Sequence, residues 1–231
     1  MREITKKIIS DIKKHSNFFR AEKEKKYHKS KREHFGVSYS RIQKTLDTYA
    51  GNLEAGELII LAKELWKTNI FECMLASTKI LKNKKIKKDK STWKNGIKFL
   101  RDCDGWALED GLSLSLRECL INHPELLDEV EKWTENKNFW IRRAALVFTL
   151  PYAKEGKDPE RMLKWAEKYT PDQEWFIQKA IGWWLRELSK HNPGRVIEFL
   201  NNNWRNLKTV ARNEATRKMG EKHRGKINQQ P

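Results

Sequence analysis

Trp106 and Asp110 are the residues of this chain whose types and spacing are best suited to chemistry. If a helix begins near Asp104, two side chains that are four residues apart share one face of it. An aromatic ring beside a carboxylate can be an ordinary helix surface, which is the simpler interpretation. The same pair can also hold the apolar face of a sugar and stabilise positive charge that develops there. Both alternatives stay open at this point.

Three further groups combine aromatic rings with cations. The run from Phe176 to Arg186 places adjacent tryptophans, a glycine and two cations on one expected helix. Arg142 and Arg143 follow Trp140, and because neighbouring helical residues point about 100° apart, at most one of the two faces a given groove. Tyr27 lies in a cluster of lysines and arginines, which suits nucleic acid. Ordinary surface cations are the alternative for Arg142 and Arg143.

The net charge points to a polyanionic partner. The chain has 231 residues, with 48 lysines and arginines against 31 aspartates and glutamates, so its formal net charge is +17. Such an excess favours nucleic acid over a membrane surface, although a charge that serves only solubility is the alternative. The lysine-rich run 82–90 is expected to be a solvated connection between helices, and contact with a phosphate backbone is the alternative.

Other kinds of chemistry lack a motif. Cys73, Cys103 and Cys119 are scattered and odd in number, without a C-x-x-C pair, so neither a disulfide framework nor a zinc site is indicated. No glycine-rich phosphate loop, metal-binding histidine spacing or nucleophile elbow occurs in the sequence. No apolar run approaches the ~18 residues that span a membrane. We therefore expect a soluble protein of the cytoplasm, with reduced thiols and without a membrane-spanning segment.

Helix signals dominate the chain, and strand signals are nearly absent. Prolines that follow a polar residue predict helix starts in the second half, and Thr170 with Gln173 matches a capping box. The segments 133–145 and 175–186 resemble two copies of one repeat about 40 residues long, as in paired-helix arrays. Residues 1–220 are expected to form a single domain and 221–231 a flexible tail. The residues that carry these expectations are Ile4, Ile8, Ile9 and Ile12 in an apolar stripe, Pro124, Pro159, Pro171 and Pro193 at helix starts, and Trp66, Trp93, Trp133 and Trp165 in the core.

Together these features resemble the AlkD-type DNA alkylation repair glycosylases, from about Tyr27 to Ala215. The segment 175–186 is the most specific of the blocks that carry the resemblance. The other blocks are Tyr27 with Phe35-Gly36-Val37, Glu64-Leu65-Trp66, Trp106 with Asp110, and the segment 140–145.

The resemblance implies an all-α, HEAT-like α-solenoid of antiparallel helix pairs whose concave basic face binds double-stranded DNA. It implies excision of N3- and N7-alkylated purines, of the 3-methyladenine and 7-methylguanine type, in base excision repair. No cofactor, metal or lysine nucleophile is needed, so no lyase activity is expected, and a monomer without an obligate protein partner suffices. Matched position by position, Asp110 resembles the catalytic carboxylate, Trp106 and Trp183 the aromatic walls of its cleft, Arg143 a phosphate-binding arginine, and Tyr27, Trp175 and Phe176 DNA contacts near the lesion.

The chain departs from the family pattern at three positions. Ala107 replaces an aspartate that often follows the cleft tryptophan, and Ser38 and Ser40 replace a polar or basic residue and a proline after the Gly-Val turn. Lesion preference therefore does not follow from the resemblance. Two alternatives remain, a non-catalytic nucleic-acid-binding helical protein that recognises DNA backbone or unusual structure, and a protein-binding HEAT scaffold, which would bind an acidic partner and no DNA.

Overall fold

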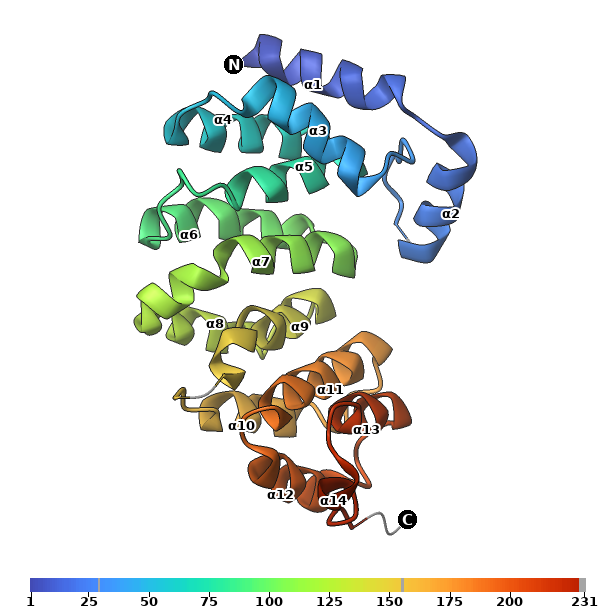
Figure 1. The fold of residues 1–231 in the computed structure, drawn as a ribbon, viewed down its shortest axis with the longest axis vertical. Helices are drawn as coiled ribbons and strands as arrows, with labels where there is room; N and C mark the ends of the chain where they lie inside the picture. The colour runs from blue at the N-terminus through green and yellow to red at the C-terminus, as the bar shows by residue number, and fades with distance from the viewer. Residues whose placement is uncertain (29, 155, 229–231) are drawn as a thin grey trace. The chain divides into compact units, whose positions relative to one another are not determined.

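The computed structural model describes residues 1–28, 30–154 and 156–228, and these fold into helices throughout (Figure 1). Within these ranges, β structure is limited to one isolated parallel bridge between Glu33 and Ile70. The chain divides into two compact units, Met1–His123 and Pro124–Pro231, and each is described by itself. The prediction of an all-α chain built from packed helix pairs, the α-solenoid class, is confirmed, whereas the concave basic face stays a prediction.

Most helices of the N-terminal unit form a stack, and α2 lies at the side of it (Figure 1). Helix α1 packs on α3 and α4, those two pack on α5, and α5 packs on α7, as Figure 1 shows in blue to green. The predicted stripe is confirmed for Ile8 and Ile12, which are buried in α1. The bounds are α1 Arg2–Lys14, α2 Phe18–His28, α3 Tyr39–Ala50, α4 Ala55–Trp66, α5 Phe71–Leu81, α6 Lys90–Gly96, the 3₁₀ helix η1 Ile97–Asp102, and α7 Trp106–Asn122.

Polar caps and buried tryptophans fix these helices. The Ser38 side chain accepts from the Arg41 N–H at the start of α3, and Asp89 caps α6 by accepting from the Thr92 N–H at 2.9 Å. Such caps satisfy amides that have no partner inside the helix. Most of the lysine-rich run 82–90 connects α5 to α6, as predicted, and its last residue, Lys90, begins α6. The expected core positions Trp66, Trp93, Trp133 and Trp165 are all buried.

A buried carboxylate holds the loop between α2 and α3. Glu72, on the first turn of α5, accepts backbone N–H bonds from Phe35 at 2.9 Å, from Gly36 at 2.6 Å and from Val37 at 3.2 Å. Gly36 has φ +72°, and a Cβ there would run into the Asn17 carbonyl and the backbone nitrogen of Ala21. The Gly-Val turn singled out in the sequence is therefore the point where this loop crosses the start of α2 closely.

The C-terminal unit is organised around α11. This helix packs on α9 and α12 and most extensively on α13. Its bounds and those of its neighbours are η2 Pro124–Leu126, α8 Leu127–Trp133, α9 Phe139–Phe148, η3 Leu150–Ala153, α10 Glu160–Lys168, α11 Trp175–Ser189, α12 Pro193–Asn203, α13 Thr209–Thr216 and α14 Glu221–Arg224.

The proline signals for helix starts are confirmed in part. Pro193 is the first residue of α12, and Asn192 caps it by accepting from the Arg195 N–H at 3.1 Å. Pro171 does not start α11, and the predicted capping box of Thr170 with Gln173 is wrong. The helix begins at Trp175 instead.

The cause is the buried side chain of Gln178. Its amide group donates to the carbonyls of Tyr169, Thr170 and Asp172 and so holds the segment as a turn. Glu174 then takes the capping role by accepting from the Phe176 N–H. The competing hydrogen bonds of one buried amide therefore override a local cap signal.

Residues near the C-terminus pack on α12. Ile227 is buried, and the Asn228 N–H donates to the Asn201 side chain at 2.7 Å. Residues 229–231 of the expected tail lie outside the described residues, and both its flexibility and the single domain 1–220 stay predictions. Across the described residues, no helix combines the length and apolar character needed to span a membrane. In the same residues, no group of His, Cys, Asp and Glu has an arrangement that could hold a metal ion.

Candidate functional site

Helix α7 presents the Trp106–Asp110 pair on its first two turns. The helix begins at Trp106, directly after Gly105, whose backbone is extended. Both side chains are half-buried. Because four residues complete about one turn, the ring and the carboxylate lie one above the other on the same face, as the spacing predicted. The structure thus supports the geometry of the pair, and its chemical role stays a proposal.

Helix α2 brings two more rings to Trp106. Tyr27 meets the tryptophan edge-on, with ring centroids 5.9 Å apart and planes at 85°. His28 approaches the same ring to 5.1 Å and also contacts Phe71 at 4.9 Å. The structure therefore unites two residues that the sequence proposed separately, Tyr27 and Trp106. It adds His28, for which the signal in the sequence was only its position beside Tyr27.

The surroundings of His28 favour its neutral form. Burial lowers the pKa of His28 below its ordinary value, and the nearby His34 adds to that effect. Glu24 and Asp104 act in the opposite direction without reversing it. The ring next to Trp106 is therefore an uncharged aromatic group at neutral pH, and it does not repel a cation there.

Polar contacts tie the end of α2 to the segment that precedes α7. The Ser30 hydroxyl donates to Asp104 at 3.1 Å, and the Arg32 guanidinium forms an ion pair with the same carboxylate. Arg32 also donates to the Asn69 side chain at 2.7 Å and to the backbone carbonyl of Asp102. These bonds fix Tyr27 and the start of α7 relative to each other.

In the C-terminal unit, α9 and α11 form a second aromatic group. The rings of Trp140 and Phe176 lie 4.8 Å apart, and Trp175 meets Phe176 edge-on at 5.0 Å. Trp175 is 50% exposed, and its role as a DNA contact stays a prediction. Arg143 is only 4% exposed, and its guanidinium lies 5.9 Å from the Trp140 ring. This part of the unit therefore combines a half-exposed ring with a buried cation.

The tandem arginines have different surroundings. Arg142 points to the loops and binds Asp172 at 2.9 Å, together with the carbonyls of Asn136 and Lys137. Arg143 lies on the other side, against Trp140. The expectation that the two point in different directions is confirmed, and the phosphate-binding role of Arg143 stays a prediction.

Trp183 lies between two cations on one face of α11. Lys179 precedes it by four residues and Arg186 follows it by three, so the three side chains share a face. The buried carboxylate of Glu214 on α13 forms ion pairs with both cations. Burial, with help from Arg186, lowers the pKa of Lys179.

Gly182 allows this arrangement. A Cβ at that position would lie 2.7 Å from the Ala211 carbonyl oxygen and 2.7 Å from the Cβ of Glu214. Helix α13 therefore approaches α11 at the glycine and brings Glu214 to the two cations. Glu214 was missed from sequence because no local pattern links it to the run around Trp183.

The family model described as DNA alkylation repair enzyme matches residues 8–219, and the chain belongs to that family. A solved structure described as a predicted DNA alkylation repair enzyme from Enterococcus faecalis is similar, with a TM-score of 0.73 and 21% sequence identity, over 90% of this chain and 98% of that chain. At that identity the likeness concerns the fold. No curated protein sequence matches the chain significantly.

Proposed function

We propose that the protein is a DNA N-glycosylase that removes positively charged N3- and N7-alkylated purines from double-stranded DNA, in base excision repair. The observation that carries the proposal is the Trp106–Asp110 pair on α7, with Tyr27 packed against the tryptophan. Membership of a DNA repair family and the net charge of +17 support DNA as the substrate. A location inside the cell fits that role.

The chemistry needs little help from the protein, because the alkylated base already carries a positive charge. When the bond between C1′ and the purine nitrogen breaks, its electron pair goes to the base and leaves oxocarbenium character on the sugar. In this proposal Asp110 stabilises that cation and orients the water that attacks C1′, and solvent water accepts the proton that the attacking water gives up as the new C–O bond forms. The Trp106 face adds a cation–π attraction of about 0.5–2 kcal/mol.

Trp183 is proposed as a further catalytic residue that contacts the substrate through its ring. The remaining candidate residues are assigned to DNA binding: Arg143 binds a phosphate, and Trp175, Phe176 and Tyr27 contact DNA near the lesion. The reaction needs no cofactor or metal and no lyase step, and a monomer can perform it. Because phosphate contacts release counterions, the affinity for DNA is expected to fall steeply as salt rises. A measured affinity that does not change with salt would contradict DNA as the ligand.

The test is excision of 7-methylguanine from a duplex oligonucleotide that carries one such base, with strand cleavage measured before and after alkali. Asp110→Asn is expected to bind the duplex as the wild type does and to lose at least about 100-fold in the single-turnover rate. Asp47→Asn is the matched control, because Asp47 is an exposed carboxylate on α3 and the substitution removes the same charge. Strand cleavage by the wild type before alkali would contradict the absence of lyase activity.

Two outcomes would overturn the mechanism. Unchanged excision by Asp110→Asn would remove the carboxylate from the reaction. Tight DNA binding without excision by any variant would favour the alternative function, a non-catalytic nucleic-acid-binding protein.

A further inference from the structure

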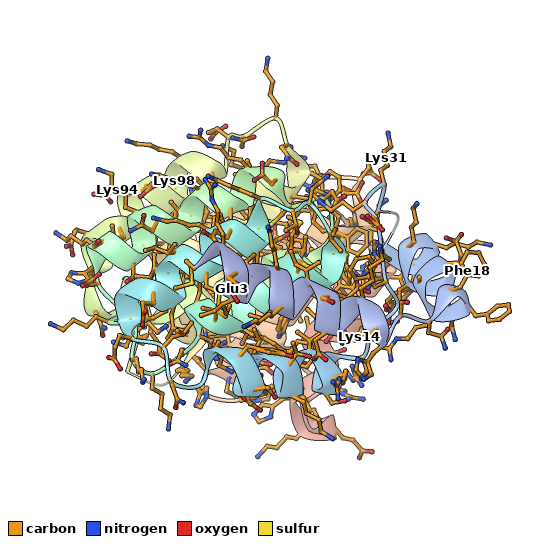
Figure 2. The ribbon with its side chains drawn as sticks, turned by 90° about the horizontal axis from the view of Figure 1, so that it is seen from above. Glu3, Lys14, Phe18, Lys31, Lys94 and Lys98 are labelled. Atoms are coloured by element: carbon orange, nitrogen blue, oxygen red, sulfur yellow. The ribbon has the colours of Figure 1, made fainter. Side chains whose placement is uncertain are left out.

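Two neighbouring phenylalanines on α2 are exposed to solvent. Phe18 is 73% exposed and Phe19 is 85% exposed, and their rings meet edge-on with centroids 6.0 Å apart. Figure 2 places Phe18 at the outer edge of α2. Within α2, all of whose residues the structure describes, Ala21 alone is buried. Packing inside the unit therefore does not explain two large apolar rings at the start of this helix.

One side of α2 alternates rings with a cation. Phe19, Lys23 and Tyr27 follow one another at intervals of four residues, so they line one face of the helix. With Arg20 and Glu24, which form an ion pair at 2.7 Å, these residues line an open cavity of about 500 Å³. Lys23 is exposed between the two rings. The face is thus an aromatic, a cation and an aromatic in series.

The spacing of these groups matches a nucleic-acid strand. Eight helical residues separate Phe19 from Tyr27, which is a rise of about 12 Å. A stacked strand advances about 3.4 Å for each nucleotide, so the interval spans three to four nucleotides. The two rings offer faces for bases, and the ammonium between them can contact a phosphate. Aromatic faces accept any base, because every base has a π-face.

We propose that this face of α2, Phe19 with Lys23 and Tyr27, binds unpaired bases of single-stranded or locally melted DNA. Phe19 stacks on one base, Tyr27 stacks on another, and Lys23 contacts the backbone between them. The charge of the helix favours a polyanion, since Arg20, Lys23, Lys25 and Lys26 outnumber its two glutamates. Tyr27 packs against Trp106, so the face continues to the candidate site on α7. In that respect the inference rests on the proposed function and extends it to DNA that is unpaired beside a lesion.

The test measures the affinity of the whole chain for undamaged DNA, by fluorescence anisotropy with a labelled 12-nucleotide oligothymidine and with a labelled duplex of the same length. Phe19→Ala is expected to weaken binding to the single strand about 5- to 150-fold, the effect of one lost stacking contact. Binding to the duplex is expected to change less than about twofold. Phe19→Trp keeps a ring and is expected to retain the affinity for the single strand.

Ile60→Ala is the matched control, because Ile60 is another exposed apolar side chain, 49% exposed, on a different helix, α4. Its affinity for the single strand is expected to equal that of the wild type. Since Phe19 and Ile60 are exposed, neither substitution removes a packed core contact. Circular dichroism checks that both variants remain folded.

Several results would overturn the inference. If Phe19→Ala lost affinity for the single strand and for the duplex equally, Phe19 would be a general DNA contact. If it lost affinity for neither, Phe19 would have no role in DNA binding. Flotation of the wild type with vesicles of phosphatidylserine and phosphatidylcholine, abolished in Phe19→Ala, would assign the face to a membrane. A concentration-dependent dimer abolished by the same substitution would assign it to a second copy of the chain.

The experiment separates this inference from the proposed function. Single-strand binding that depends on Phe19, without any excision of 7-methylguanine, would contradict the glycosylase proposal and support the α2 face as a binding site. Excision without single-strand binding would support the glycosylase and contradict the role of the α2 face.

Discussion

Glu72→Gln tests whether one buried carboxylate holds the loop that attaches α2. Glu72 is fully buried, and its two oxygens share three backbone donors, one from Phe35 on the first oxygen and those of Gly36 and Val37 on the second. Glutamine has the same size but only one oxygen. In its better orientation it keeps the bonds from Gly36 and Val37 and turns its NH₂ group toward the Phe35 N–H. Two donors then face each other in a buried place.

The cost follows from these three bonds. A hydrogen bond to a charged acceptor contributes about 1.5–3 kcal/mol and one to a neutral acceptor about 0.5–1.5 kcal/mol, so the two surviving bonds lose about 2 kcal/mol together. The unsatisfied donor costs about 1–3 kcal/mol more, and easier burial of a neutral side chain offsets part of the sum. We expect a net loss of about 3 kcal/mol. For a chain of this length that lowers Tm by about 6–12 °C.

Thermal unfolding followed by circular dichroism measures the shift, and Glu57→Gln is the matched control. Glu57 is exposed on α4, where it accepts one backbone hydrogen bond from the Glu54 N–H at 2.9 Å. Glu57→Gln is therefore expected to lower the free energy of unfolding by less than about 1 kcal/mol. Amide exchange at Phe35, Gly36 and Val37 should accelerate in Glu72→Gln alone. Equal Tm values for the two variants, with unchanged exchange, would refute the role assigned to Glu72.

Two further predictions concern single residues of the candidate site. Because the pKa of His28 lies below its ordinary value of 6.5, the unfolded chain takes up the proton first as the pH falls. The stability that depends on neutral His28 is thus complete above about pH 6.5 and declines below it, and His28→Phe should show a smaller fall in Tm between about pH 7 and pH 5. Gly182→Ala places a Cβ 2.7 Å from the Ala211 carbonyl oxygen. Overpacking of about 1–3 kcal/mol should exceed the gain in helix propensity of about 1 kcal/mol. Urea unfolding should therefore show a lower free energy of unfolding for this variant.

The fold was predictable because its signals are local. The apolar stripe of α1 and the proline at the start of α12 each act within one helix, and the structure confirms Ile8 and Ile12 of the stripe and Pro193 at the helix start. The start of α11 was not predictable in the same way. Gln178 lies in the interior of that helix, and its side chain donates to carbonyls of the preceding turn. The conformation around Pro171 is therefore set by a residue several positions later in the chain.

In the candidate site, too, local features could be predicted from the sequence and contacts between distant helices could not. The shared face of Trp106 and Asp110 follows from helical spacing, and the structure has it. The approach of His28 to Trp106 joins helices far apart in the chain, and periodicity carries no information about such a pair. Trp175 was proposed as a DNA contact from the resemblance alone, and its exposure is consistent with that proposal without assigning a role.

The residue types of the run around Trp183 are restricted because α11 must both pack closely against α13 and position two cations beside the tryptophan. The inner side of α11 must be narrow at Gly182, since α13 contacts it there through its backbone. That close approach brings Glu214 to Lys179 and Arg186, which fixes the long side chains of both cations on either side of the tryptophan. A larger residue at the glycine would therefore disturb the half-buried face of Lys179, Trp183 and Arg186 as well as the packing. The glycine and the cations of this run are thus linked physically, through a residue on another helix.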